Sequence, residues 1–149
     1  MLAGDGVASV RFGESTSAAI AGLDRLLGHP PKGPVSETGN CNIDAAQQWS
    51  GLTGFFNKGE FVGYSTGERL TQRNIEAATG LRVGDTVARA QRIYGSAFQT
   101  SLAQGGSWSV PTRSGKLIGY LSAEPDQPGP VPTITSIEAG SVGCPAATP

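Results

Sequence analysis

The sequence predicts an α+β fold of two tandem repeats, each a helical segment packed on an antiparallel sheet of three to four strands. One observation is a repeated turn-and-helix segment. Residues 10–28 (VRFGESTSAAIAGLDRLLG) and 80–95 (GLRVGDTVARAQRIYG) both combine an apolar run, a glycine turn, polar capping residues, an apolar stripe and a closing glycine. A second observation is a repeated hairpin, because residues 57–64 (NKGEFVGY) align without gaps with 113–120 (RSGKLIGY).

A third match completes the pattern, since SIEA at 136–139 resembles NIEA at 74–77. The three matches follow one another in the same order in both halves. We therefore predict two repeats between short tails. The predicted units are a first repeat at 7–79, a second repeat at 80–144, and tails at 1–6 and 145–149.

The elements of the first repeat follow from its periodicities. Ile20, Leu23 and Leu27 recur at the helical period, and the prolines after Gly28 end that helix. Asn57-Lys58-Gly59 is typical of a hairpin turn, so we expect strands on both sides of it. The predicted elements are a strand at 7–12, a helix at 15–27, and strands at 43–49, 52–56, 60–65 and 73–78.

The second repeat is predicted to follow the same order. Asp85 or Thr86 offers a side-chain oxygen to the free backbone donors of a helix start, and Gly95 ends this helix. Strands are expected at 108–112, 116–121 and 133–139. Strict alternation would place Phe61, Gly63, Leu117 and Gly119 on the helix-facing side of the sheet, and Val62, Tyr64, Ile118 and Tyr120 on the opposite, open side.

Composition limits the classes of function. The chain has 149 residues, enough for one domain or two small subdomains on one core, and its 22 Gly and 10 Pro favour turns and short strands. The net charge of −1 does not suggest a nucleic-acid-binding protein. No apolar run is long enough to span a membrane.

The two cysteines, Cys41 and Cys144, are far apart in the chain and lie in loop-like surroundings, GNCN and GCP. They favour a disulfide and hence an oxidising compartment, with a pair of free thiols as the alternative. The first residues, MLAGDG, lack the basic start and apolar stretch of a secretory signal. We therefore expect a secreted or cell-envelope protein whose signal or lipid anchor is absent from this chain.

The motifs VRFGES with LLGHP, and LRVGDT with IYG, resemble the repeat of the β-lactamase inhibitor protein of soil actinomycetes and of the SmpA/OmlA-type envelope lipoproteins. The resemblance implies helical elements packed on an antiparallel sheet. For the inhibitor it implies two repeats whose joined sheet forms a concave, aromatic-rich binding surface. The inhibitor has a disulfide within each repeat, whereas Cys41 and Cys144 would join the first repeat to the C-terminal end. No residue here matches an inhibitory contact, so β-lactamase inhibition does not follow.

Candidate catalytic groups are few. His29 is the only histidine, and its place after a helix end suits the helix dipole better than a Ser-His-Asp site, since no nucleophile elbow accompanies it. Glu76 and Glu138 occupy matched strand positions and are either a structural pair or an acid/base pair. The glycines before the second helix favour a turn over an anion site, because the lysine of a P-loop is missing. We predict no enzyme, no metal site and no cofactor.

Four aromatic side chains on predicted strands, Trp49, Tyr64, Trp108 and Tyr120, belong either to the core or to an exposed binding patch. Tyrosine and tryptophan combine a large contact area with a polar group, which suits protein interfaces. The predicted function is a monomeric, non-catalytic protein-binding module that docks another extracellular or envelope protein on its open sheet face. The alternative is an envelope protein that binds a small molecule or lipid in a pocket between helix and sheet.

Overall fold

The computed structural model describes residues 2–28, 43–49, 51–67, 76–77, 79–102, 105–126, 128–129 and 131–142. His29, Cys41 and Cys144 lie outside these ranges, so the disulfide and the role of the histidine stay predictions. The same holds for most of the strand expected at 73–78.

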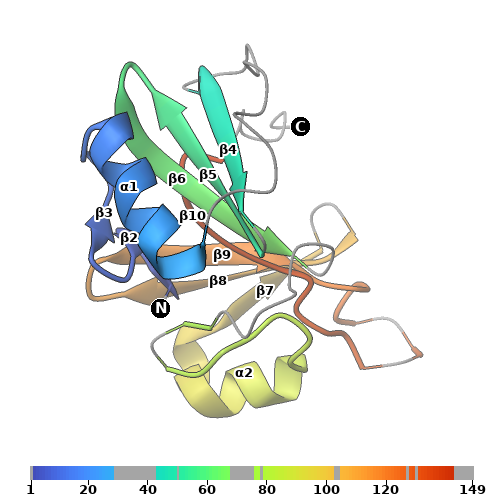
Figure 1. The fold of residues 1–149 in the computed structure, drawn as a ribbon. Helices are drawn as coiled ribbons and strands as arrows, with labels where there is room; N and C mark the ends of the chain where they lie inside the picture. Colours follow the sequence, from blue (N-terminus) through green and yellow to red (C-terminus); the bar gives the residue numbers. More distant parts are fainter. Residues whose placement is uncertain are drawn as a thin grey trace.

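The described part of the chain forms two sheets, two α-helices and a short 3-10 helix (Figure 1). The elements are β1 (Leu2–Ala3), β2 (Gly6–Val7), β3 (Val10–Arg11), α1 (Thr16–Leu27), β4 (Ala45–Trp49), β5 (Leu52–Asn57), β6 (Glu60–Gly67), α2 (Val87–Tyr94), η1 (Gly95–Ala97), β7 (Gln99–Ser101), β8 (Ser107–Thr112), β9 (Gly115–Tyr120) and β10 (Ser136–Gly140). A three-stranded sheet has the order β1-β2-β3, and a seven-stranded sheet has the order β4-β5-β6-β10-β9-β8-β7.

The predicted α+β fold of two helix-on-sheet repeats is wrong, because the described chain is mostly β and its strands do not divide into two such units. The C-terminal strand β10 pairs with β6 on one side and with β9 on the other. The small sheet β1-β2-β3 precedes only the first helix. Helix α1 packs on β3 and β6, whereas α2 approaches no strand as extensively and buries only Val87 and Ala90.

Both helices begin and end where local signals place them. The Ser15 Oγ accepts a hydrogen bond from the Ala18 N–H, and the Thr86 Oγ1 accepts one from the Arg89 N–H. Asp85, the other predicted cap, instead accepts from the Arg82 N–H in the preceding turn. The two hairpin turns also form as expected. The strand expected at 7–12 is instead two short strands, β2 and β3, joined by a turn. Strand β7 was not expected.

A β-bulge at Val62 changes the phase of β6. Across the β5–β6 pair, Phe56 lies opposite Phe61 while Phe55 lies opposite Gly63, so Val62 is an extra residue on β6. Because one extra residue shifts every later side chain to the other face, Tyr64 lies on the same face as Phe61. The expectation that Tyr64 points away from the helices, with Gly63 on the side of Phe61, is therefore wrong.

The core fills the face of the large sheet that α1 and the small sheet cover, which we call the covered face. Phe12 contacts both Phe61 and Tyr64, with ring centroids 5.1 Å and 6.1 Å away. The Tyr64 hydroxyl donates a hydrogen bond of 2.8 Å to the Ala3 carbonyl. These contacts tie the central strand β6 to the N-terminal strands, and they explain why Tyr64 is fully buried.

The burial of Tyr64 gives a direct test of the bulge. Tyr64→Ala should lower the free energy of unfolding by about 3–5 kcal/mol, because a fully buried aromatic side chain is removed. Tyr120→Ala is the matched control: this side chain is 41% exposed, and its loss should cost about 0.5 kcal/mol or less. Urea unfolding followed by circular dichroism measures both values. Equal losses would contradict the assignment of the two tyrosines to opposite faces.

Candidate functional site

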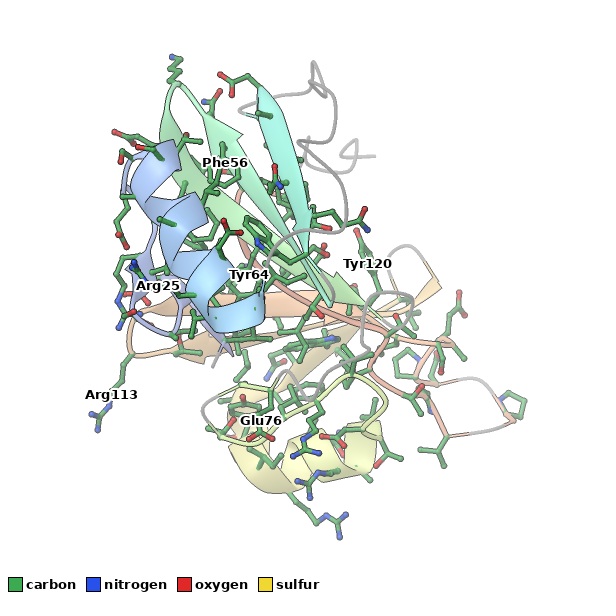
Figure 2. The ribbon with its side chains drawn as sticks, in the orientation of Figure 1. Arg25, Phe56, Tyr64, Glu76, Arg113 and Tyr120 are labelled. Atoms are coloured by element: carbon green, nitrogen blue, oxygen red, sulfur yellow. The ribbon has the colours of Figure 1, made fainter. Side chains whose placement is uncertain are left out.

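The four aromatic residues predicted to bind a partner do not form one patch. Trp49 and Tyr64 are fully buried and Trp108 is 2% exposed, whereas Tyr120 is 41% exposed. Figure 2 shows Tyr64 close to α1 and Tyr120 well away from both helices. Three of the four side chains are therefore part of the core, where a partner does not reach them.

Each buried tryptophan has a specific partner on the covered face. The Trp49 Nε1 donates a hydrogen bond of 2.8 Å to the Asp24 carboxylate of α1. The Trp108 Nε1 donates to the Ser136 carbonyl at 3.2 Å, and its ring stacks on Phe98. Gly119 makes room for this indole, because a Cβ there would lie 2.5 Å from Trp108 Nε1. Gly119 lies on the covered face, as expected, but the space above it is filled by the indole of Trp108 and not by a helix.

The opposite side of the large sheet carries half-buried and exposed side chains, and we call it the open face. Strand pairing aligns Thr53 with Ser65, Ser65 with Glu138, Glu138 with Ile118, and Ile118 with Ser109. Phe55 lies two residues from Thr53 and Tyr120 two residues from Ile118, so both lie on this face as well. The open face is defined by these residues: Thr53, Phe55, Ser65, Ser109, Ile118, Tyr120 and Glu138.

Glu138 is the carboxyl group at the centre of the open face. It lies on β10, the strand between β6 and β9, and it is half-buried. Burial raises the pKa of Glu138, and a hydrogen bond from Ser65 offsets only part of that effect. Burial, and then the charge of Glu138, also raise the pKa of Tyr120. The two groups therefore interact electrostatically on the surface.

Within the described residues, no lysine or arginine forms an ion pair with Glu138. The arginine pairs found there are Arg11 with Asp5, Arg82 with Glu76, and Arg89 with Asp85. Lys116 lies on the same face two residues from Ile118, but its side chain is exposed and makes no salt bridge with Glu138. The carboxylate at the centre of the open face is consequently uncompensated by a cation of the described chain.

The other candidate groups have different roles. Glu76 is paired with Arg82 at 2.7 Å, and its carbonyl accepts from the Leu2 N–H, so its surroundings differ from those of Glu138. The structure does not join the two carboxylates into a site. In the turn before α2, the N–H groups of Gly80 and Gly84 donate to backbone carbonyls, which leaves neither of them for an anion.

A pocket of about 390 Å³ opens between the end of α2 and the large sheet. Leu2 and Leu117 form part of its apolar wall, and both are buried. Tyr94, the last residue of α2, lines it with Thr79, and their hydroxyl oxygens lie 2.5 Å apart in a hydrogen bond. One of these two hydroxyl protons satisfies that bond, so the other is free to meet an acceptor.

The described ranges contain no group of three or more histidine, cysteine, aspartate or glutamate residues able to hold a metal ion. None of the helices found in them is long and apolar enough to cross a membrane. Comparison with protein-family models, with curated proteins and with solved structures finds no match to this chain. The resemblance inferred from the short motifs therefore stays a prediction.

Sequence reasoning placed Ile118 and Tyr120 on the open side and matched Glu138 with Glu76, but it did not place Glu138 on that side or single out Ser65 or Phe55. The sequence does contain a signal for the burial of Trp108. Polar and apolar residues alternate along β8, in the order Ser107, Trp108, Ser109 and Val110. That alternation places Trp108 in the core. The position of Glu138 beside Ser65 and Ile118 depends on long-range strand pairing, which no local pattern encodes.

The raised pKa of Glu138 predicts a pH-dependent stability. The folded state holds this proton more tightly than the unfolded chain, so the contribution of Glu138 to stability is greatest below the ordinary pKa of 4.5 and falls as the pH rises through the raised value. Glu138→Gln keeps the shape and stays neutral. The free energy of unfolding of Glu138→Gln, relative to that of the parent, should therefore increase as the pH rises from about 3.5 to about 7.5.

Urea unfolding at the two pH values measures this change, and Glu124→Gln controls for the loss of one negative charge from the surface. A difference between Glu138→Gln and the parent that does not vary with pH would contradict the burial of this carboxyl group.

Proposed function

We propose that the chain is a non-catalytic protein-binding module that docks the surface of another protein on its open face. The observation that carries the proposal is the half-buried carboxyl group of Glu138 among hydroxyl, apolar and aromatic side chains, on a sheet face whose side chains the described helices leave accessible. Tyr120 adds an exposed aromatic ring with a polar end, the kind of side chain that anchors interfaces.

The proposed function is the one expected from the sequence, but different residues of the open face perform it. Tyr120 is retained from the four predicted residues, and Phe55, Ile118 and Glu138 join it in place of the three buried ones. The partner remains another extracellular or envelope protein. This location rests on the disulfide predicted between Cys41 and Cys144, which would require an oxidising compartment.

A matched pair of substitutions tests the docking proposal. Tyr120 is 41% exposed on the open face, and Leu26 is 43% exposed on α1, so arginine at either position adds the same charge at equal exposure. Peptides selected from a random displayed library against the parent protein serve as the probe. Tyr120→Arg should weaken their binding by about tenfold or more, measured by biolayer interferometry, because hot-spot aromatic residues dominate interface energies.

Leu26→Arg should leave the binding of these peptides unchanged. Peptides that bind the Tyr120→Arg variant as tightly as the parent would place the preferred docking surface elsewhere and overturn the proposal.

A second candidate function rests on the pocket between α2 and the sheet. Its volume of about 390 Å³ lies in the range of small-ligand sites, and its walls are largely apolar with the Tyr94–Thr79 hydroxyl pair as a polar group. The ligand would be a small apolar molecule, or one chain of a lipid, with a single hydrogen-bond acceptor.

The probe for this candidate is N-phenyl-1-naphthylamine, an apolar dye that fluoresces when it is shielded from water. Ala3→Leu narrows the pocket that Ala3 lines and should abolish most of the fluorescence gain, whereas Ala21→Leu on the exposed side of α1 should not. Circular dichroism checks that both variants are folded. Equal fluorescence from both variants, or none from the parent, would dismiss the pocket as a ligand site.

A further inference from the structure

The surroundings of Glu138 define the chemistry of a partner more closely than the open face as a whole. Its neighbours across the two strand pairs are Ser65 on β6 and Ile118 on β9. Ser65 donates a hydrogen bond to the carboxyl group. Ile118 supplies an apolar side chain, and Tyr120 lies two residues further along β9. The carboxylate therefore has one neutral donor and an apolar border.

The charged groups near Glu138 do not neutralise it. Ser65 and Ile118 carry no charge. The Tyr120 hydroxyl is neutral at physiological pH, because even the ordinary pKa of tyrosine, about 10, lies well above it, and burial raises that pKa further. The Ser136 hydroxyl accepts a hydrogen bond from the Tyr120 N–H. Lys116, further along β9, makes no salt bridge with Glu138. In the described ranges the carboxylate consequently depends on Ser65 and on water.

A protein surface that docks here removes that water. An apolar surface would leave a buried and unpaired carboxylate, which is strongly unfavourable, whereas a cationic side chain would compensate it. Lysine and arginine also carry long aliphatic stems that pack along apolar surface while the charged group reaches its partner. Ile118 and the ring of Tyr120 are placed for such a stem, and an aromatic face attracts a cation as well.

We infer that the protein partner inserts a lysine or arginine side chain whose charged group pairs with Glu138 while its stem lies along Ile118 and Tyr120. This inference rests on the proposed docking function and adds the chemistry of the partner to it. Charge complementarity at one central residue would mainly select partners and fix their register on the sheet. The flanking apolar side chains would contribute contact area.

The test uses peptides selected from a random displayed library against the parent protein, Glu138→Gln and Glu124→Gln. Peptides selected by the parent and by Glu124→Gln should be enriched in lysine or arginine beside apolar residues. Replacing that basic residue by norleucine or citrulline should weaken binding to the parent by about tenfold or more. Glu138→Gln should bind the basic and the neutral peptides equally well.

The outcomes separate the inference from the function on which it rests. If peptides that lose binding to Tyr120→Arg show no preference for basic residues, the open face docks proteins but the cation inference is overturned. If the peptides bind Tyr120→Arg unchanged, the proposed function fails and the inference with it. If the parent self-associates in sedimentation velocity and Glu138→Gln does not, the occupant is a second copy of this chain, which overturns the inference of a different partner.

Discussion

The bulge at Val62 determines which side chains of β6 belong to the core and which to the surface. With the extra residue, Phe61 and Tyr64 share the covered face, and Ser65 lies on the open face opposite Glu138. In an unbroken strand Tyr64 and Ser65 would exchange sides, because side chains alternate strictly. The Tyr64 hydroxyl would then lose the Ala3 carbonyl, and Glu138 would lose its hydrogen-bond donor. The packing of the core and the chemistry of the open face thus depend on the same residue.

The position of β10 explains why a carboxyl group lies at the centre of the sheet. This strand comes last in the described chain, but it pairs between β6 and β9 and so joins the strands of both halves. A residue on a central strand has neighbours on both sides, and its side chain loses more water than it would on an edge strand. Glu138 accordingly carries a raised pKa, although it lies on the face that the helices leave accessible. Topology, and not local sequence, gives this residue its properties.

The sequence predicted well what is local and poorly what is not. The cap at Ser15, the closing glycines and the two hairpin turns follow from short patterns with a direct physical cause. The repeat was inferred from the same patterns, but a capped helix start indicates where a helix begins and not what it packs against. Two segments with similar sequence patterns therefore pack differently: α1 lies on β3 and β6, whereas α2 approaches no strand as extensively. Strict alternation failed at Tyr64 because a bulge leaves no mark in a polar–apolar pattern. For Trp108, the polar–apolar alternation along β8 is the local pattern that favours a place in the core.

The surroundings of Glu138 favour a binding role over an acid/base role. An acid/base pair acts beside a substrate cleft, but Glu76 is paired with Arg82, and the pocket of about 390 Å³ at the end of α2 is lined by neither Glu76 nor Glu138. A neutral glutamine would keep the shape of Glu138 without the cost of a partly desolvated charge. The partial desolvation that disfavours the lone carboxylate also strengthens its attraction to a cation. A charged group that lowers the stability of the free protein can therefore favour binding when a partner compensates its charge. The free energy that folding loses at Glu138 would then be recovered on docking, and only by a partner of opposite charge.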